Sequence, residues 1–162
     1  KDWQFDFNHF LKQPLLMERY LHPFEREIGE YARKQPPILE QAILLWNCIH
    51  HTVRIYQEEH PDWLFYRHED LSISPIKQFK EIFDRLDLEF TPAVEKEIRL
   101  STGEHNPVEQ DPLNEFNRNS RKNIYNWKKR LATDEISLIR DRTASVADSF
   151  YSPEEWGTAE YA

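Results

Sequence analysis

The segment PDWLFYRHEDL, residues 61–71, decides how the fold is interpreted. Its first half is short and aromatic, follows a turn signal at His60-Pro61-Asp62 and is apolar on both faces, which predicts a central strand over Trp63–Arg67. Three titratable residues, His68, Glu69 and Asp70, directly follow Arg67 at the carboxyl end of the strand, where α/β proteins place ligands. An ordinary exit from strand to loop, with a turn beginning at Asp70 or Ser72, accounts for the same residues. Judged by residue types alone, the ordinary exit is the preferred interpretation.

Helical spacing precedes this segment. Residues 2–32 repeat apolar side chains every three to five positions, with breaks expected near Pro14 and Pro23. From Ile38 the spacing alternates by four and three, which predicts a helix from about Pro37 to Glu59 with one buried face. The residues predicted for that face are Ile38, Ala42, Leu45, Trp46, Ile49, Val53 and Tyr56.

Helices are also expected after the segment. Ser74-Pro75 and Thr91-Pro92 each combine an N-cap residue with a proline at the first helical position, and Thr133 is expected to cap a last long helix. The polar stretch Ser101–Lys122 is expected to be a loop. One strand among helices cannot close a sheet, so the strand over residues 63–67 is expected to lack its partners.

Composition bounds the class of protein. By its length, the chain is expected to form a single domain over residues 1–162. Its 21 Lys and Arg against 29 Asp and Glu give a net charge of −8, which argues against nucleic-acid binding as the main role. No uncharged apolar run approaches the roughly 18 residues that cross a bilayer. The single cysteine, Cys48, suits a reducing cytoplasm. The adjacent His50 and His51 point about 100° apart on a helix and cannot both bind one ion, so no metal site is expected.

Two omissions add to this interpretation. The chain has only three glycines and contains neither a GxxxxGK nor a GxGxxG pattern, so a phosphate-binding glycine loop is absent from it. It also begins at Lys1 rather than at methionine. We therefore expect that further sequence precedes Lys1.

Basic residues gather in the window NSRKNIYNWKKR, residues 119–130, which holds five of the 21 Lys and Arg. Arg121 and Arg130 offer forked donors that suit phosphate, and Lys122, Lys128 and Lys129 add compact charge. Helical periodicity is poor before Trp127, so residues 120–123 are expected to wrap an anion with backbone and hydroxyl donors. A solvated basic face is the alternative, and the chemistry favours the anion site.

Together these segments resemble the C-terminal half of sulfotransferases that use 3′-phosphoadenosine 5′-phosphosulfate (PAPS), in particular the prokaryotic members. Residues 61–71 followed by Ser74-Pro75-Ile76 are similar to the family's strand and YEDL…P segment. Ser120-Arg121-Lys122, followed by Asn126-Trp127-Lys128 and Leu131, is similar to its RKG…WK…L segment. The resemblance covers nearly the whole chain.

The resemblance implies an α/β, P-loop-kinase-like three-layer fold, of which this chain would be the mostly helical part with about one core strand. Arg121, with Ser120 and Lys122, would hold the 3′-phosphate of the cofactor, and Lys128 would be a secondary phosphate contact or simply solvated. His68 stands where the family usually has a tyrosine near the adenine. The complete enzyme would transfer a sulfuryl group to a hydroxyl or amine of a small-molecule or glycan acceptor, without a metal.

The glycine loop, its lysine and the general base lie upstream in the family, so no catalytic residue is named and the 162 residues alone are expected to be inactive. The alternative is a non-catalytic helical interaction module that keeps the shape of the fold and has lost its chemistry. Aromatic side chains in residues 3–24 would then face a partner, and a homodimer contact is one option. The sequence does not reveal the acceptor or the oligomeric state.

Overall fold

The computed structural model describes residues 4–103 and 119–156 of the chain. Within these ranges all regular structure is helical and there is no strand, which confirms the mostly helical character. No helix in the same ranges is long and apolar enough to cross a membrane. The packing divides the chain into two compact units, one of Lys1–Trp63 with Ala132–Ala162 and one of Leu64–Leu131. The expectation of a single domain over 1–162 stays a prediction.

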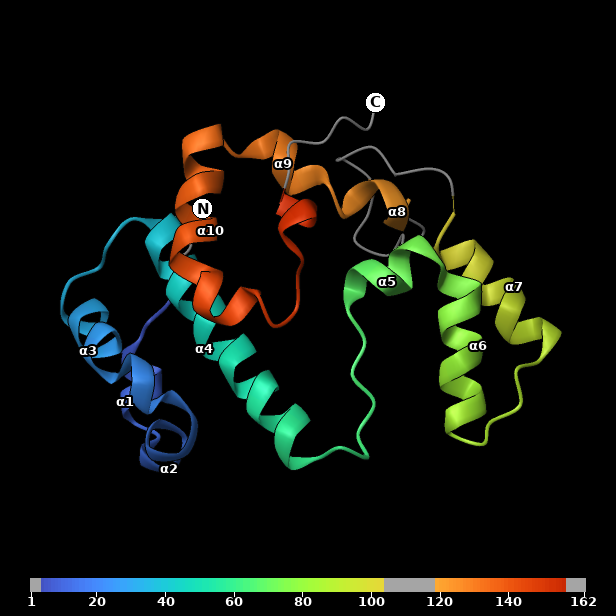
Figure 1. The fold of residues 1–162 in the computed structure, drawn as a ribbon, viewed down its shortest axis with the longest axis horizontal. Coiled ribbons are helices and arrows are strands. Elements are labelled where there is room, and N and C mark those ends of the chain that lie inside the picture. Colours follow the sequence, from blue (N-terminus) through green and yellow to red (C-terminus); the bar gives the residue numbers. More distant parts are fainter. Residues whose placement is uncertain (1–3, 104–118, 157–162) are drawn as a thin grey trace. The chain divides into compact units, whose positions relative to one another are not determined.

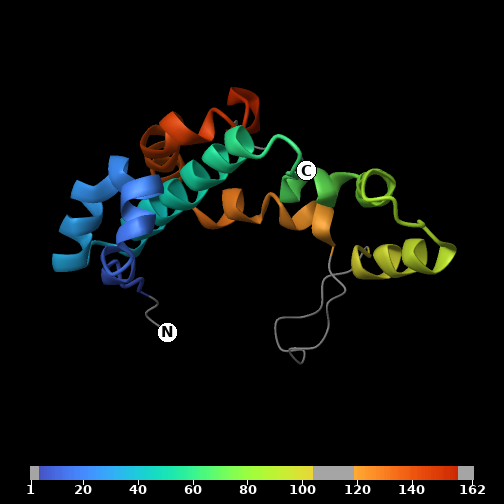
Figure 2. The ribbon, with the colours of Figure 1, turned by 90° about the horizontal axis from the view of Figure 1, so that it is seen from below.

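The first unit is built around one long helix and the helices that pack on it (Figure 1). Its elements are α1 (Asn8–Leu11), α2 (Pro14–Leu16), the π-helix η1 (Met17–Leu21), the 3₁₀-helix η2 (His22–Phe24), α3 (Glu25–Arg33), α4 (Ile38–Glu59), α10 (Thr133–Ala147) and the 3₁₀-helix η3 (Pro153–Trp156). The expected breaks near Pro14 and Pro23 are confirmed, because α2 begins at Pro14 and Pro23 lies in η2. Figure 2 shows α10 lying against α4, the two helices that make the most extensive packing in the unit.

The core of this unit lies where the N-terminal segment meets α4. Phe7, Leu21 and Ile28 pack with Leu44 and Cys48, and all five are almost completely buried. Burying side chains of this size stabilises a fold by roughly 1.5–3 kcal/mol each. The aromatic residues near the N-terminus therefore serve the core of this unit.

The bounds predicted for the long helix are confirmed within one residue, but its predicted buried face is only partly correct. Leu45, Trp46, Val53 and Tyr56 are half-buried, whereas Ile38, Ala42 and Ile49 are exposed. Ile38 and Ile49 are 50% and 48% exposed, whereas the fully buried positions are Gln41, Ile43, Leu44, Asn47 and Cys48. The cause is that α4 buries the amides of Gln41 and Asn47, which form hydrogen bonds with backbone groups, although the Asn47 Oδ1 has no partner among the described residues. Gln41 accepts from the Phe5 N–H at 3.0 Å and donates to the Pro36 carbonyl at 2.7 Å. The Asn47 side chain donates to the Arg142 carbonyl of α10 at 2.9 Å.

The second unit is a set of short helices joined by turns. Its elements are α5 (His68–Ile73), α6 (Pro75–Arg85), α7 (Pro92–Ser101), α8 (Ser120–Asn123) and α9 (Asn126–Arg130). α5 packs against α6 and α8, and α6 packs against α7. Residues 104–118, most of the loop expected between Ser101 and Lys122, lie outside the described residues.

The helix starts follow the predicted capping residues closely. Ser74 and Thr91 are the N-caps of α6 and α7, and the Thr91 hydroxyl accepts from the Val94 N–H at 3.3 Å. The expectation for Thr133 is wrong by one position, because Ala132 is the N-cap of α10 and its N–H donates to the Glu135 carboxylate at 2.8 Å. The Glu135 carboxylate thus satisfies the N–H of the N-cap residue, which is one half of a capping box, and the alanine side chain has no acceptor for the other half.

The predicted strand over residues 63–67 is not formed. Residues 64–67 have no regular structure, and α5 begins at His68, where a strand-to-loop exit was expected. The physical reason is that a strand is stable only when its backbone forms hydrogen bonds with a neighbouring strand, and the described residues contain no such strand. His68, Glu69 and Asp70 consequently lie on the first turn of a helix and not at the end of a strand.

Candidate functional site

The basic window forms two short helices, α8 and α9, in the second unit. α8 is one turn, capped by the Asn119 side chain, which accepts from the Lys122 N–H at 2.9 Å. The Asn123 N–H donates to the Asn119 carbonyl at 3.1 Å and the Ile124 N–H to the Ser120 carbonyl at 3.3 Å. Two of the four backbone N–H groups of residues 120–123, those of Lys122 and Asn123, are therefore used within the turn. The expectation that residues 120–123 wrap an anion stays a prediction.

The side chains of Arg121 and Lys122 are exposed on this turn. Neither forms an ion pair with a carboxylate of the described residues. In the same unit Arg67, Arg85 and Arg99 do pair with a carboxylate three or four residues away, at 2.9, 3.4 and 2.6 Å. Among the described residues, Arg121 and Lys122 thus differ from these three arginines in having no carboxylate partner.

The helix that carries His68 lies next to the helix that carries the basic residues. α5 contacts α8 within the unit (Figure 1), so His68 and Ser120-Arg121-Lys122 belong to neighbouring elements although 52 residues separate positions 68 and 120 in the sequence. His68 is exposed, and its Nε2 lies 3.4 Å from the hydroxyl of the buried Ser72 one turn further on. The structure therefore brings together two of the segments that the sequence singled out separately.

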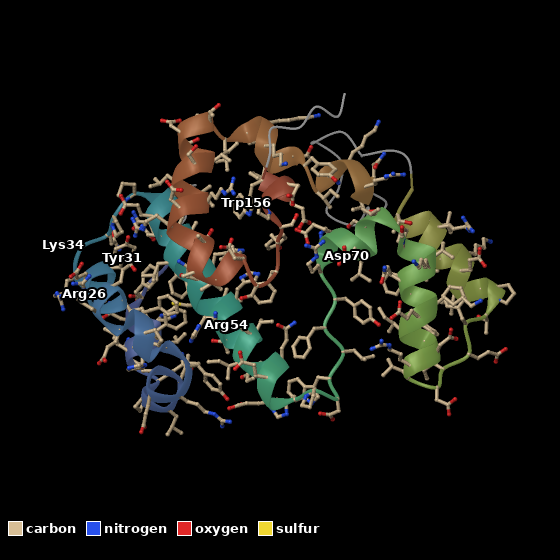
Figure 3. All side chains as sticks on the ribbon, viewed as in Figure 1. Arg26, Tyr31, Lys34, Arg54, Asp70 and Trp156 are labelled. Carbon is tan, nitrogen blue, oxygen red and sulfur yellow. The ribbon has the colours of Figure 1, made fainter. Side chains whose placement is uncertain are left out.

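An ion pair fixes the start of α5. The Arg67 Nε and Nη2 donate to the two carboxylate oxygens of Asp70, at 3.0 and 2.9 Å, and Figure 3 labels Asp70 on this helix. The hydrogen bond from Arg67 holds the pKa of the Asp70 carboxyl below its ordinary value. The sequence analysis named both residues but not their pairing, which the spacing of three positions on a helix would have indicated.

The ammonium of Lys128 lies near two aromatic rings. Lys128 is half-buried on α9, and its ammonium lies 5.7 Å from the centre of the Tyr125 ring and 5.3 Å from that of Trp127. Both distances are within the range of a cation–π contact. Ile124, the residue that follows α8, is buried and anchors this segment in the packing of the unit. Lys129 and Arg130 follow and are exposed.

Tyr66 is a residue of the unit that the sequence analysis missed. Its hydroxyl is buried and has no hydrogen-bond partner among the described residues. It lies one position before Arg67, on the segment that leads into α5. No sequence pattern identifies such an atom, because the absence of a partner is a property of the packed structure.

The donor set on α8 fits a phosphate dianion. Arg121 and Lys122 are exposed at successive positions of α8, a hydroxyl precedes them at Ser120, and residues 119–131 contain no Asp or Glu. Among the described residues no three His, Cys, Asp or Glu side chains converge as they would around a metal ion. The arrangement supplies binding and charge neutralisation and contains no group to which a catalytic proton transfer is assigned.

Comparison of the chain with known proteins found no match. No protein-family model matches the chain, and no curated protein or solved structure matches it either.

Proposed function

We propose that this chain is the C-terminal part of a PAPS-dependent sulfotransferase and that α8 binds the 3′-phosphate of the cofactor. The observation that carries the proposal is that Arg121 and Lys122 are exposed in a segment without Asp or Glu, in a protein of net charge −8. Their helix, α8, packs against α5, which carries His68. The proposal includes the P-loop-kinase-like three-layer fold that the sequence resemblance implies.

Each residue has a defined role in this proposal. Bound PAPS supplies the sulfuryl group and a phosphoadenosine that can be held at a distance from it. Arg121 and the Ser120 hydroxyl would donate hydrogen bonds to the 3′-phosphate, and Lys122 would add a compact positive charge. His68 offers an exposed ring beside this turn for the adenine. Lys128, with its ammonium over two rings, acts mainly by bracing α9 and raising the local positive potential.

These side chains account for binding and not for the chemical step. In-line transfer to a hydroxyl or amine depends on positioning and on neutralising charge at the leaving phosphate, by analogy with phosphoryl transfer. The described residues hold the end of the cofactor remote from that phosphate. We therefore expect the 162 residues alone to bind the product nucleotide and to show no turnover.

Adenosine 3′,5′-bisphosphate (PAP), the product nucleotide, tests the proposal in the full-length protein. At a concentration of 100 times its Kd, PAP stabilises the protein by about 2.7 kcal/mol, which a thermal melt detects easily. We expect this shift with PAP, a smaller one with ATP, and none in Arg121→Ala. Arg26→Ala is the matched control, because Arg26 is exposed on α3, outside the unit that contains α8.

The non-catalytic interaction module is the alternative, and one observation favours it. Leu15 on α2 is 79% exposed, and Ile38 and Ile49 on α4 are about half exposed, as side chains that contact a partner would be. Unchanged melting at saturating PAP in the wild-type protein would replace the sulfotransferase proposal with this one. An equal shift in wild type and Arg121→Ala would place nucleotide binding elsewhere on the protein.

A further inference from the structure

His51 and Arg54 lie one turn apart on the second half of α4 and contact each other. The Arg54 Nη2 lies 3.0 Å from the His51 Nδ1. A guanidinium only donates hydrogen bonds, so the Nδ1 is the acceptor, and an imidazole nitrogen accepts only when it carries no proton. The contact therefore requires a neutral imidazole with its proton on Nε2.

The same guanidinium reaches the helix that packs on α4. The Arg54 Nη1 donates to the Ser145 carbonyl near the end of α10, at 3.4 Å, across 91 positions of the sequence. Figure 3 labels Arg54 on α4. Both helices belong to the first unit and make its most extensive packing. Arg54 thus joins an imidazole on one helix to the backbone of the other.

A second contact between the two helices involves no titratable side chain. The Asn47 side chain donates to the Arg142 carbonyl at 2.9 Å, one turn nearer the start of α10. In the last turn of α10, Val146 and Ala147 are buried, with exposures of 2% and 1%. The amide therefore ties the earlier turn to α4, whereas apolar burial and the Arg54 guanidinium hold the last turn.

Two charges of its own helix act on the half-buried His51. Burial and the charge of Arg54 lower the pKa of the imidazole, and the charge of Glu58 raises it, with a net lowering from the ordinary value. Glu58 is exposed and lies two turns further on, whereas Arg54 is within hydrogen-bond distance, so the arginine has the larger effect. From η2, the Phe24 ring lies 5.4 Å away between ring centres and nearly perpendicular to the imidazole.

Charged groups on the other elements packed against α4 are paired with each other or exposed. Arg19 of η1 forms an ion pair with Glu59 at 2.9 Å, and Glu27 of α3 forms one with Arg142 of α10 at 2.6 Å. The exposed groups are Glu18 of η1, His22 of η2 and Asp148 at the end of α10. A proton on His51 would thus be opposed first by the guanidinium that it contacts.

We propose that His51 and Arg54 form an acid-sensitive latch between α4 and α10. The neutral imidazole accepts from the guanidinium and holds it against the Ser145 carbonyl. When the Nδ1 takes up a proton from solvent, it no longer accepts, and two positive charges stand at hydrogen-bond distance. The guanidinium then moves away, and the last turn of α10 loses one of its ties to α4. The latch is independent of the proposed sulfotransferase function.

The direction of the pH dependence follows from the neutral form. Because the pKa of His51 is lowered in the folded protein, its stabilising contribution is complete above the ordinary histidine value of 6.5 and is lost as the pH falls through the folded value. The last turn of α10 should therefore loosen in mildly acidic solution. The Asn47 contact persists there, so the preceding turn should keep its packing.

Hydrogen exchange of the full-length protein at about pH 7.5 and about pH 5.5 tests the latch. The readout is the protection factor of the Val146 and Ala147 amides, which corrects for the intrinsic pH dependence of exchange. His51→Asn removes the titration and keeps an acceptor where the Nδ1 lies. His22→Asn is the matched control, because His22 is an exposed histidine of the same unit. Urea unfolding at the higher pH verifies that each variant is folded.

We expect wild type and His22→Asn to lose about fivefold in protection at these amides on acidification, as the loss of one hydrogen bond requires, and His51→Asn to lose none. Arg54→Gln should show the lower protection at both pH values. In that variant His51 should also titrate at a higher pH by nuclear magnetic resonance, because a neighbouring positive charge is gone. The proposal is overturned if His51→Asn responds to acid like the wild type, if His22→Asn abolishes the response, or if Arg54→Gln leaves the titration of His51 unchanged.

Discussion

The Arg67 guanidinium and the Asp70 carboxylate meet through two hydrogen bonds, of 3.0 and 2.9 Å, at the first turn of α5. A forked pair of this kind fixes both distance and orientation. It therefore sets where the extended segment ends and where the helix begins. The exposed position of His68 and the contact of its helix with α8 depend on that boundary.

The pair makes the stability of this unit dependent on pH. The pKa of Asp70 is lowered in the folded protein, chiefly by the hydrogen bond from Arg67, so the ionised carboxylate stabilises the fold above the ordinary pKa of an aspartate. That contribution is lost as the pH falls through the folded value. Asp70 is 41% exposed, so solvent screening keeps the effect small, and we expect Asp70→Asn to cost about 0.5 kcal/mol at pH 7.

Urea unfolding of wild type and Asp70→Asn at pH 7 and at an acidic pH below the ordinary pKa of an aspartate measures this difference. The difference should be smaller at the lower pH, because part of the stabilisation by the ionised carboxylate is then lost. Glu97→Gln, at an exposed position on α7, is the control and should unfold like the wild type at both pH values. A difference that is the same at both pH values would mean that the ion pair is not its source.

Two tyrosines predict mutational effects of opposite sign. The Tyr66 hydroxyl is buried without a partner among the described residues, whereas the Tyr31 hydroxyl donates to the Glu40 carboxylate at 3.1 Å (Tyr31 is labelled in Figure 3). An unsatisfied buried hydroxyl costs roughly 1–3 kcal/mol, and a satisfied one contributes roughly 1 kcal/mol. Tyr66→Phe should therefore stabilise the protein and Tyr31→Phe should destabilise it, each by about 1 kcal/mol in chemical denaturation. Destabilisation by Tyr66→Phe would show that the hydroxyl has a partner, such as an ordered water.

The thiol of Cys48 is expected to be chemically inert in the folded protein. Cys48 is 1% exposed, and burial raises its pKa to about 12, so almost no thiolate exists near neutral pH. Because the thiolate is the reactive form, iodoacetamide at pH 8 should leave the native protein unmodified and alkylate it fully in urea. Mass spectrometry distinguishes the two states. Rapid modification of the native protein would contradict the burial of this side chain.

Sequence patterns were sufficient for the ends of the helices and insufficient for their faces. The proline and capping residues at positions 74–75 and 91–92 place the starts of α6 and α7 correctly, because those signals act within a few residues. The buried face of α4 depends instead on partners far away in the sequence. A pattern of apolar residues assigns Gln41 and Asn47 to the exposed face because both are polar. Their hydrogen bonds to backbone groups of Phe5, Pro36 and Arg142 nevertheless allow both to be buried.

The segment at residues 63–67 shows the same limit for strands. Its residue types favour a strand, but a strand exists only when a neighbour completes the hydrogen bonds, and none lies within the described residues. The candidate site divides in the same way. The charge of residues 119–130 can be read from the sequence. The helical turn at Ser120–Asn123 and its contact with α5 could not be predicted, because they depend on packing between segments far apart in the chain.

The face of α4 gives the most direct test of the packing. Leu44 is 1% exposed in the core with Phe7, Leu21 and Ile28, and Ile49, five positions further on, is 48% exposed. Truncating a buried leucine removes transfer free energy and leaves a cavity, so Leu44→Ala should lower the free energy of unfolding by about 2–4 kcal/mol. Ile49→Ala should cost less than about 1 kcal/mol, because most surface truncations are mild and alanine has the higher helix propensity. Urea unfolding followed by circular dichroism at 222 nm compares the two variants under identical conditions. If Ile49→Ala were the more damaging change, α4 would bury the face that its apolar periodicity predicts, through a contact with residues outside those described.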